Sequence, residues 1–143
     1  MKALTISPEF VELITNGIKT IECRTWKTDY RGDILITSSA RKKAGTIPSH
    51  ALCIAELYDV RPMKKTDADA ACMKQSDCTS KNFAWLLRNV RLIEPFETKG
   101  KLSLWNFEDE SKIKVIMTVE ELFSKPNEEY NAICERYWVD LYV

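Results

Sequence analysis

The sequence predicts an α+β fold in which a small, strongly bent β-sheet or barrel carries helices at its periphery. Short segments with the alternating pattern of strands are separated and followed by helical patterns. The chain has 143 residues, which suits one domain with a sizeable core. No internal repeat, linker or low-complexity tract divides it, so we expect a single domain over residues 1–143.

Five segments are expected to share one curved sheet. They are residues 2–6, 20–24, 33–38, 51–60 and 84–94. Two further segments follow in the sequence: residues 102–107 are expected to be extended or irregular, and residues 113–116 to form a last short strand.

The first helix is predicted between Ser7 and Gly17. Ser7 is a typical N-cap, and Pro8 suits the first helical position because its missing N–H is not needed there. Asn16-Gly17 is typical of a helix end, since glycine readily adopts a left-handed conformation.

Later helices follow similar signals. Thr66 is expected to cap a short helix that ends near Met73. Thr118 and Glu121 have the spacing of a capping box, and Pro126 can open one more helix.

Composition excludes some classes of function. Lys and Arg number 21 and so do Asp and Glu, and this balance argues against a protein that coats long nucleic acids by bulk charge. The basic residues are concentrated before residue 106, which leaves room for a basic face in that part. No segment is long or apolar enough to cross a membrane, and no signal peptide opens the chain.

The cysteines indicate a reducing, cytoplasmic environment. There are five, an odd number, without a Cys-x-x-Cys pair, and Cys23, Cys53 and Cys134 stand in apolar patterns that predict small buried thiols. With His50 as the one histidine, four zinc ligands are not found at usual spacings, so neither a metal nor another cofactor is expected.

Residues 16–32 contain the most informative pattern. In the strand at residues 20–24, Glu22 and Arg24 point to the same face, and Lys19 stands at the entry to that strand. A lysine, a carboxylate and an arginine close to aromatic residues suit an anionic ligand with a flat face, such as a nucleotide. Arg24 could bind phosphate or hold Glu22, and Glu22 could stiffen the cleft by pairing or accept from a base amine. We favour the pairing, because an unpaired, partly buried carboxylate is costly.

The pattern Gly17-x-Lys19-x-x-Glu22-x-Arg24 resembles the signature of the ASCH domain, the activating signal cointegrator homology region. Its surroundings agree, and the likeness covers about residues 1–107, with a helical extension at residues 118–143. The agreeing context is Met1 to Ile6 before the Pro8 helix, Trp26, Tyr30-Arg31-Gly32, Trp85, and Lys99-Gly100-Lys101-Leu102-x-Leu104-Trp105.

The resemblance implies a PUA-like curved β-barrel with a cleft lined by the signature residues. ASCH domains are generally expected to bind RNA there, and we expect a single-stranded or flipped base with its phosphates as the ligand. The predicted ligand-binding residues are Lys19, Glu22, Arg24, Trp26, Tyr30, Arg31, Ser38, Ser39, Lys99, Lys101 and Trp105.

A second interpretation is a small hydrolase. Some small ASCH relatives are amidohydrolases that deacetylate N4-acetylcytidine, and others have been proposed to be nucleases. In such an enzyme Lys19 and Glu22 would be the catalytic residues. The amidohydrolase relatives have a threonine three residues after the lysine, where this chain has Glu22, and their second carboxylate has no match here. Non-enzymatic binding is therefore the favoured expectation.

Overall fold

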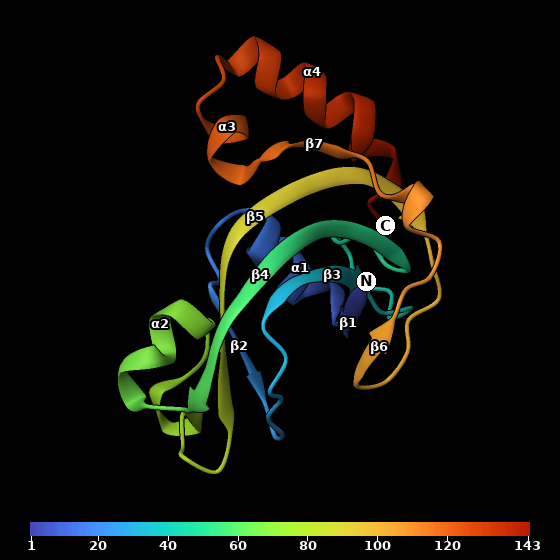
Figure 1. Ribbon diagram of the computed structural model, residues 1–143. Coiled ribbons are helices and arrows are strands. Elements are labelled where there is room, and N and C mark those ends of the chain that lie inside the picture. Colours follow the sequence, from blue (N-terminus) through green and yellow to red (C-terminus); the bar gives the residue numbers. More distant parts are fainter.

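The computed structural model describes residues 1–143 and shows a mixed seven-stranded sheet curled into a half-barrel (Figure 1). The strands run in the order β2-β5-β4-β3-β1-β6, and β7 pairs with β5 outside this path. β1 and β3 are parallel and the other pairs are antiparallel. The strands are β1 (Lys2–Ile6), β2 (Ile21–Arg24), β3 (Gly32–Ser38), β4 (His50–Pro62), β5 (Phe83–Glu97), β6 (Leu104–Asn106) and β7 (Val115–Thr118).

The five predicted sheet segments are confirmed, and the two longest strands produce the curl. β4 has 13 residues and β5 has 15, and their pairing shifts register at three places. Such bulges bend a strand and increase its twist, so the long β4–β5 ribbon arches and carries its neighbours with it. The last strand begins at Val115 and ends at Thr118, two residues later than residues 113–116, because pairing with Arg91–Ile93 of β5 sets its position.

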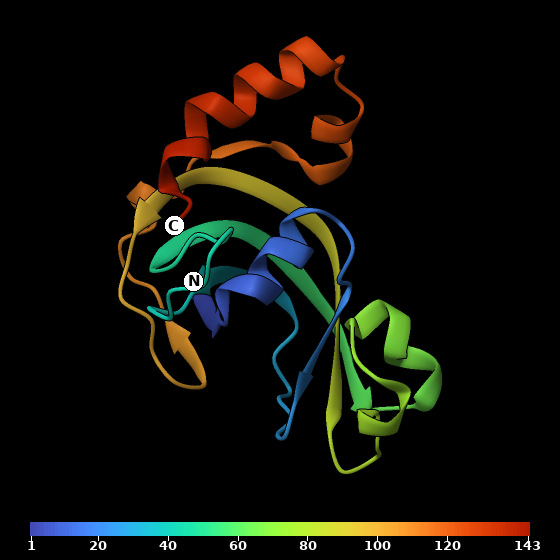
Figure 2. The same cartoon turned by 180° about the vertical axis from the view of Figure 1, so that it is seen from behind.

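Four α-helices accompany the sheet: α1 (Pro8–Thr15), α2 (Ala68–Ala71), α3 (Val119–Phe123) and α4 (Asn127–Tyr137). Single 3-10 turns occur at Lys65–Asp67, Gln75–Asp77, Glu110–Lys112 and Val139–Leu141. None of the helices combines the length and hydropathy needed to span a bilayer. Figure 2 shows α1 within the curl of the sheet, and α4 beyond β5 and β7.

The helix-start predictions had mixed outcomes. The capping box is confirmed, because the Glu121 N–H donates to Thr118 Oγ1 at 3.1 Å and the Thr118 N–H donates to Glu121 Oε1 at 3.3 Å. Ser7 does precede α1, but its side chain makes no capping bond. Thr66 is not a cap. It lies within the Lys65–Asp67 turn, where the Asp67 carboxylate accepts the Lys64 N–H at 2.8 Å.

The core has three parts. The largest joins α1, α3 and the C-terminal segment to one face of the sheet, with Val11, Ile14 and Trp85 fully buried in it. On the other face, Leu35 and Ile93 are covered by the segment from Trp105 to Ile113. A small third cluster lies under α2.

The cysteines only partly follow the prediction. All five are free, as expected for thiols without a Cys-x-x-Cys pair, and Cys53 is fully buried, which raises its thiol pKa to about 12. Cys23 and Cys134 are only half-buried, while Cys78 is buried under α2. The local pattern around Cys78 resembles a loop, and only packing against Ile21 and Met63 buries it.

Candidate functional site

A cleft of about 590 Å³ lies where the two edges of the curled sheet approach each other. β2 is at one end of the strand order, and β1 and β6 are at the other. The end of β1, the start of α1, β2 and a loop after β5 surround the opening. The lining residues are Leu4, Thr5, Ile6, Ser7, Phe10, Glu22, Cys23, Arg24, Ser39, Ala40, Lys99, Gly100, Lys101, Leu102 and Ser103.

Lys19, Glu22 and Arg24 meet on the β2 side of this cleft. Glu22 lies between the two cations: its Oε1 is 3.5 Å from Lys19 Nζ, and its Oε2 is 3.3 Å from Arg24 Nη2. The Cys23 N–H also donates to Glu22 Oε1 at 3.2 Å. Glu22 is 6% exposed, and this burial is tolerable because both carboxylate oxygens have partners. The structural pairing favoured from the sequence is therefore present.

Lys19 is a buried cation that supports the cleft from behind. It is 2% exposed, it donates from Nζ to the Ala71 carbonyl at 2.6 Å, and the ammonium lies 5.2 Å from the centre of the Phe10 ring. It is absent from the cleft lining, so contact with a ligand would require it to leave the Ala71 carbonyl. In this arrangement Lys19 ties the end of α2 to β2 and neutralises Glu22.

Arg24 connects the two edges of the half-barrel. Its Nη2 donates to the Thr5 carbonyl of β1 at 3.1 Å while contacting Glu22 on its own strand. The Nε of Arg24 is buried and has no hydrogen-bond partner. Since the guanidinium offers five donors and these contacts use only Nη2, donor capacity remains at the cleft wall.

Residues 99–103, here called the rim loop, form the opposite wall. The Lys101 N–H donates to Thr5 Oγ1 at 3.2 Å, and the Trp105 indole N–H donates to the same oxygen at 3.1 Å. Gly100 lies so close to Thr5 that a Cβ there would be 2.4 Å from Thr5 Cγ2. Lys99 and Lys101 are exposed, and the Lys101 ammonium lies 5.3 Å from the centre of the Trp105 ring.

Several predicted ligand-binding residues lie outside the cleft lining. Trp26 packs edge-on against Trp85, with ring centroids 4.7 Å apart. The Tyr30 hydroxyl donates to the Asp33 carbonyl, and burial raises the Tyr30 pKa. These aromatic rings therefore serve the core.

Of three further polar residues that were predicted to bind the ligand, Ser39 lines the cleft, whereas Arg31 and Ser38 do not. Arg31 donates to the carbonyls of Thr28 and Tyr30. Ser38 is fully buried, and its hydroxyl bonds to the backbone of His50. Ser38 is the last residue of β3, whereas Ser39 follows the strand and donates its N–H to the Ile6 carbonyl at the end of β1, which places it at the cleft.

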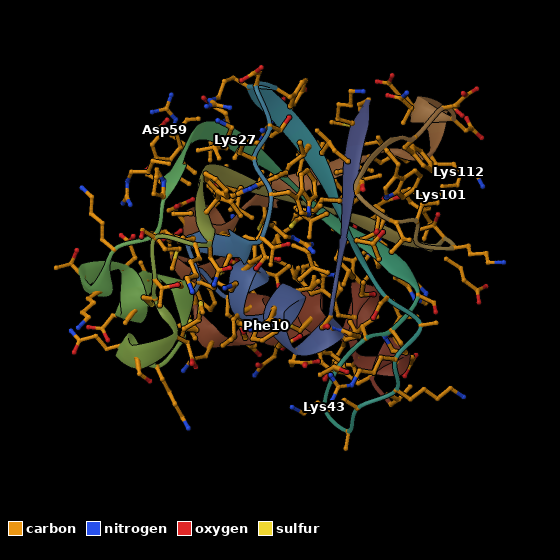
Figure 3. All side chains as sticks on the ribbon, turned by 90° about the horizontal axis from the view of Figure 1, so that it is seen from below. Phe10, Lys27, Lys43, Asp59, Lys101 and Lys112 are labelled. Carbon is orange, nitrogen blue, oxygen red and sulfur yellow. The ribbon has the colours of Figure 1, made fainter.

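The cleft also contains residues that the sequence did not indicate. Phe10 belongs to the apolar stripe of α1, and Thr5 to the first strand, so neither has a local signal for a site. Leu102 and Ser103 extend the Lys99–Lys101 turn into the lining. Figure 3 looks at the molecule from below and shows Phe10 on α1 and Lys101 on the rim loop.

Fold and cleft together define a class: a curled half-barrel of mixed strands with helices at its edges, as in PUA-like domains. Within that class, the chain belongs to the ASCH domain family, whose model matches residues 4–122. The expected resemblance and fold are thereby confirmed, and the family is one associated with RNA binding.

Solved structures show the same fold. The crystal structure of ASCH from Zymomonas mobilis is 19% identical with a TM-score of 0.60, covering 76% of this chain and 88% of that chain. A tyrosine-to-phenylalanine mutant of that protein is 20% identical with a TM-score of 0.58, covering 76% and 91%. A serine-to-alanine mutant is 17% identical with a TM-score of 0.58, covering 76% and 89%. A sequence comparison with curated proteins gave no match.

Proposed function

We propose that this ASCH domain binds RNA, with one unpaired or flipped base in the cleft and the neighbouring phosphates along the rim loop. The observation that carries the proposal is the charge of the lining. Arg24, Lys99 and Lys101 face the cleft, whereas its one carboxylate, Glu22, is neutralised inside the protein. An open cavity of about 590 Å³ also falls within the usual size of small-ligand sites.

Arg24 is the best-placed phosphate or base contact on the β2 wall. Its side chain is 24% exposed and fixed by Thr5 and Glu22, so little conformational freedom would be lost on binding. Its unpartnered Nε donor supports a role toward an acceptor that a ligand brings, because buried donors are normally paired.

The rim loop would position the phosphates. Lys99 and Lys101 are exposed lysines two residues apart, held in place by the contacts of Gly100 and Lys101 with Thr5. Trp105, which was predicted to bind the ligand, is outside the cleft lining, and its ring contacts the Lys101 ammonium. Phe10 offers an aromatic surface inside the cleft on which a base could stack.

The test is equilibrium binding of fluorescent single-stranded RNAs of mixed sequence, measured by anisotropy over a range of salt. We expect Lys101→Ala to weaken binding roughly fivefold to tenfold and to reduce the salt slope by about 0.7. Lys27→Ala is the matched control, because Lys27 is also exposed and is absent from the cleft lining. Wild-type protein without measurable RNA affinity would refute the proposal, as would equal losses in both variants.

A hydrolase remains the second candidate, because Glu22 lines the cleft beside a buried lysine. Lys19 and Glu22 would then be catalytic, acting on a modified nucleoside such as N4-acetylcytidine or on RNA. A general acid or base must reach the proton that it transfers, and here both groups are already bonded within the protein. Incubation with modified nucleosides and short RNAs, followed by mass spectrometry, distinguishes a hydrolase from a binding module, because new products would establish turnover.

A further inference from the structure

Leu102 is the most exposed large apolar side chain of the molecule. It is 92% exposed, whereas the next such residue, Ile18, is 58% exposed. Isolated apolar residues are ordinary on protein surfaces. Leu102 differs because it belongs to the lining of the cleft and lies at its mouth, directly after Lys101.

The rim loop holds Leu102 in this position. Before it, the Thr98 N–H donates to the Ser49 carbonyl at 2.9 Å, and the Lys101 N–H donates to Thr5 Oγ1. After it, Ser103 has a positive φ of 61°, which directs the chain back into β6. With Lys101 bonded to Thr5 on one side and Leu104 paired with Leu4 of β1 on the other, the loop presents the Leu102 side chain to solvent.

We propose that Leu102 is a wedge that enters a base stack, and that the ligand is therefore a base extruded from a paired or stacked RNA segment. This inference rests on the proposed RNA-binding function. Apolar wedges between base steps stabilise unstacked nucleic acid, and they are useful where a single base must leave its stack. A ligand that is already single-stranded and unstacked would need no such residue.

The charges around Leu102 fit this substrate class. Lys99 and Lys101 precede it in the loop and can hold the phosphates that flank the extruded nucleotide. Arg24 and Phe10 lie within the cleft, where the extruded base would arrive. The leucine would then occupy the space that the base vacates, with cations on the strand beside it.

The experiment compares two RNA probes of the same sequence: a short duplex with one central mismatch, and its isolated strand. 2-Aminopurine next to the mismatched base reports local unstacking, and four duplexes place each base in turn at that position. We expect the wild-type protein to bind at least one duplex with a rise in fluorescence. Leu102→Ala should lose that rise and bind this duplex roughly tenfold more weakly, while binding the single strand within about twofold of wild type.

Two variants control for other causes. Leu102→Met keeps a flexible apolar side chain and should retain the signal, whereas Val115→Ala, on β7 with 55% exposure and outside the cleft lining, should have no effect. An unchanged duplex signal in Leu102→Ala overturns the wedge, as does wild-type protein that binds the strand but not the duplexes. Absence of binding to either probe overturns the proposed function itself, and the wedge with it.

Discussion

On the β2 wall of the cleft, the charged groups have partners inside the protein, whereas the charged groups of the rim loop face solvent. Glu22 pairs with both Lys19 and Arg24, and each of these cations also donates to a backbone carbonyl. Lys99 and Lys101 form no salt bridge. The same residue types thus serve two purposes: the buried charges join secondary-structure elements, and the exposed ones remain available to a ligand.

This difference changes how the signature is understood. We call the place where β2 and β1 are joined across the cleft by Lys19, Glu22 and Arg24 the seam. Its ion pairs hold the edges of the half-barrel at a fixed separation, because Arg24 bonds across to β1 while Glu22 fixes Arg24. These ion pairs affect a ligand in two ways: they fix the shape of the cleft, and they position Arg24. Substitutions of the charged residues on the two walls should therefore differ in their effect on the free energy of unfolding, measured without a ligand.

The largest expected effect is on the buried pair. Glu22→Gln removes the one negative charge between Lys19 and Arg24, and we expect it to lower the free energy of unfolding by about 3 kcal/mol, because it leaves a buried ammonium without compensation. Urea unfolding measures this. Glu110→Gln is the matched control, since Glu110 is 64% exposed in its contact with the N-terminus and should change little. A loss below about 1 kcal/mol for Glu22→Gln would show that the seam is not a stabilising element.

The next effect tests how the rim loop is held. In Gly100→Ala the new methyl group would be 2.4 Å from Thr5 Cγ2, so the loop must shift, and we expect a loss of about 2 kcal/mol together with weaker RNA binding. Thr5→Ser removes that methyl group and keeps the hydroxyl that bonds Lys101 and Trp105. In a double-mutant cycle, Thr5→Ser should recover a large part of the loss. Strict additivity of the two changes would show that this contact does not position the loop.

The smallest effect calibrates the seam against an ion pair whose carboxylate is similarly buried but whose cation, Arg61, is 28% exposed, compared with 2% for Lys19. Asp67 accepts two bonds from Arg61, each 2.8 Å long, and the Arg61 guanidinium holds the pKa of that carboxyl below its usual value. The pair therefore stabilises the fold above the unfolded pKa of about 4, and this stability is lost as the pH falls through the lower, folded pKa.

Asp67→Asn should accordingly lower the free energy of unfolding by about 1.5 kcal/mol at pH 7. The deficit relative to wild type should shrink as the pH falls below about 4, where the wild-type carboxyl also becomes neutral. Urea unfolding at several pH values measures both. A deficit that stays constant down to the lowest pH would assign the loss to the capping bond with the Lys64 N–H instead of to charge.

Local patterns predicted the strands and two helix starts well, because alternation and capping depend on near neighbours. The Thr118–Glu121 capping box is complete within four residues, and the sequence predicts it correctly. Prediction failed where a partner distant in sequence decides the outcome. The limits of β7 follow from its register with β5. The Thr66 prediction failed for a more local reason: Thr66 lies inside a 3-10 turn, where the Asp67 carboxylate, which is also bonded to Arg61, accepts the Lys64 N–H.

The sequence by itself determined the family, the curled sheet and the grouping of Lys19, Glu22 and Arg24, since strand alternation brings Glu22 and Arg24 to one face. Only the tertiary structure decided which charges are buried and which surround the cleft. Lys19 is buried because Ala71 of α2 accepts from it, and the rim loop reaches the cleft because Gly100 packs on Thr5, 95 residues earlier in the chain. Such contacts depend on how far the sheet curls and which segments it brings together, and the register shifts between the assembled strands β4 and β5 set that extent.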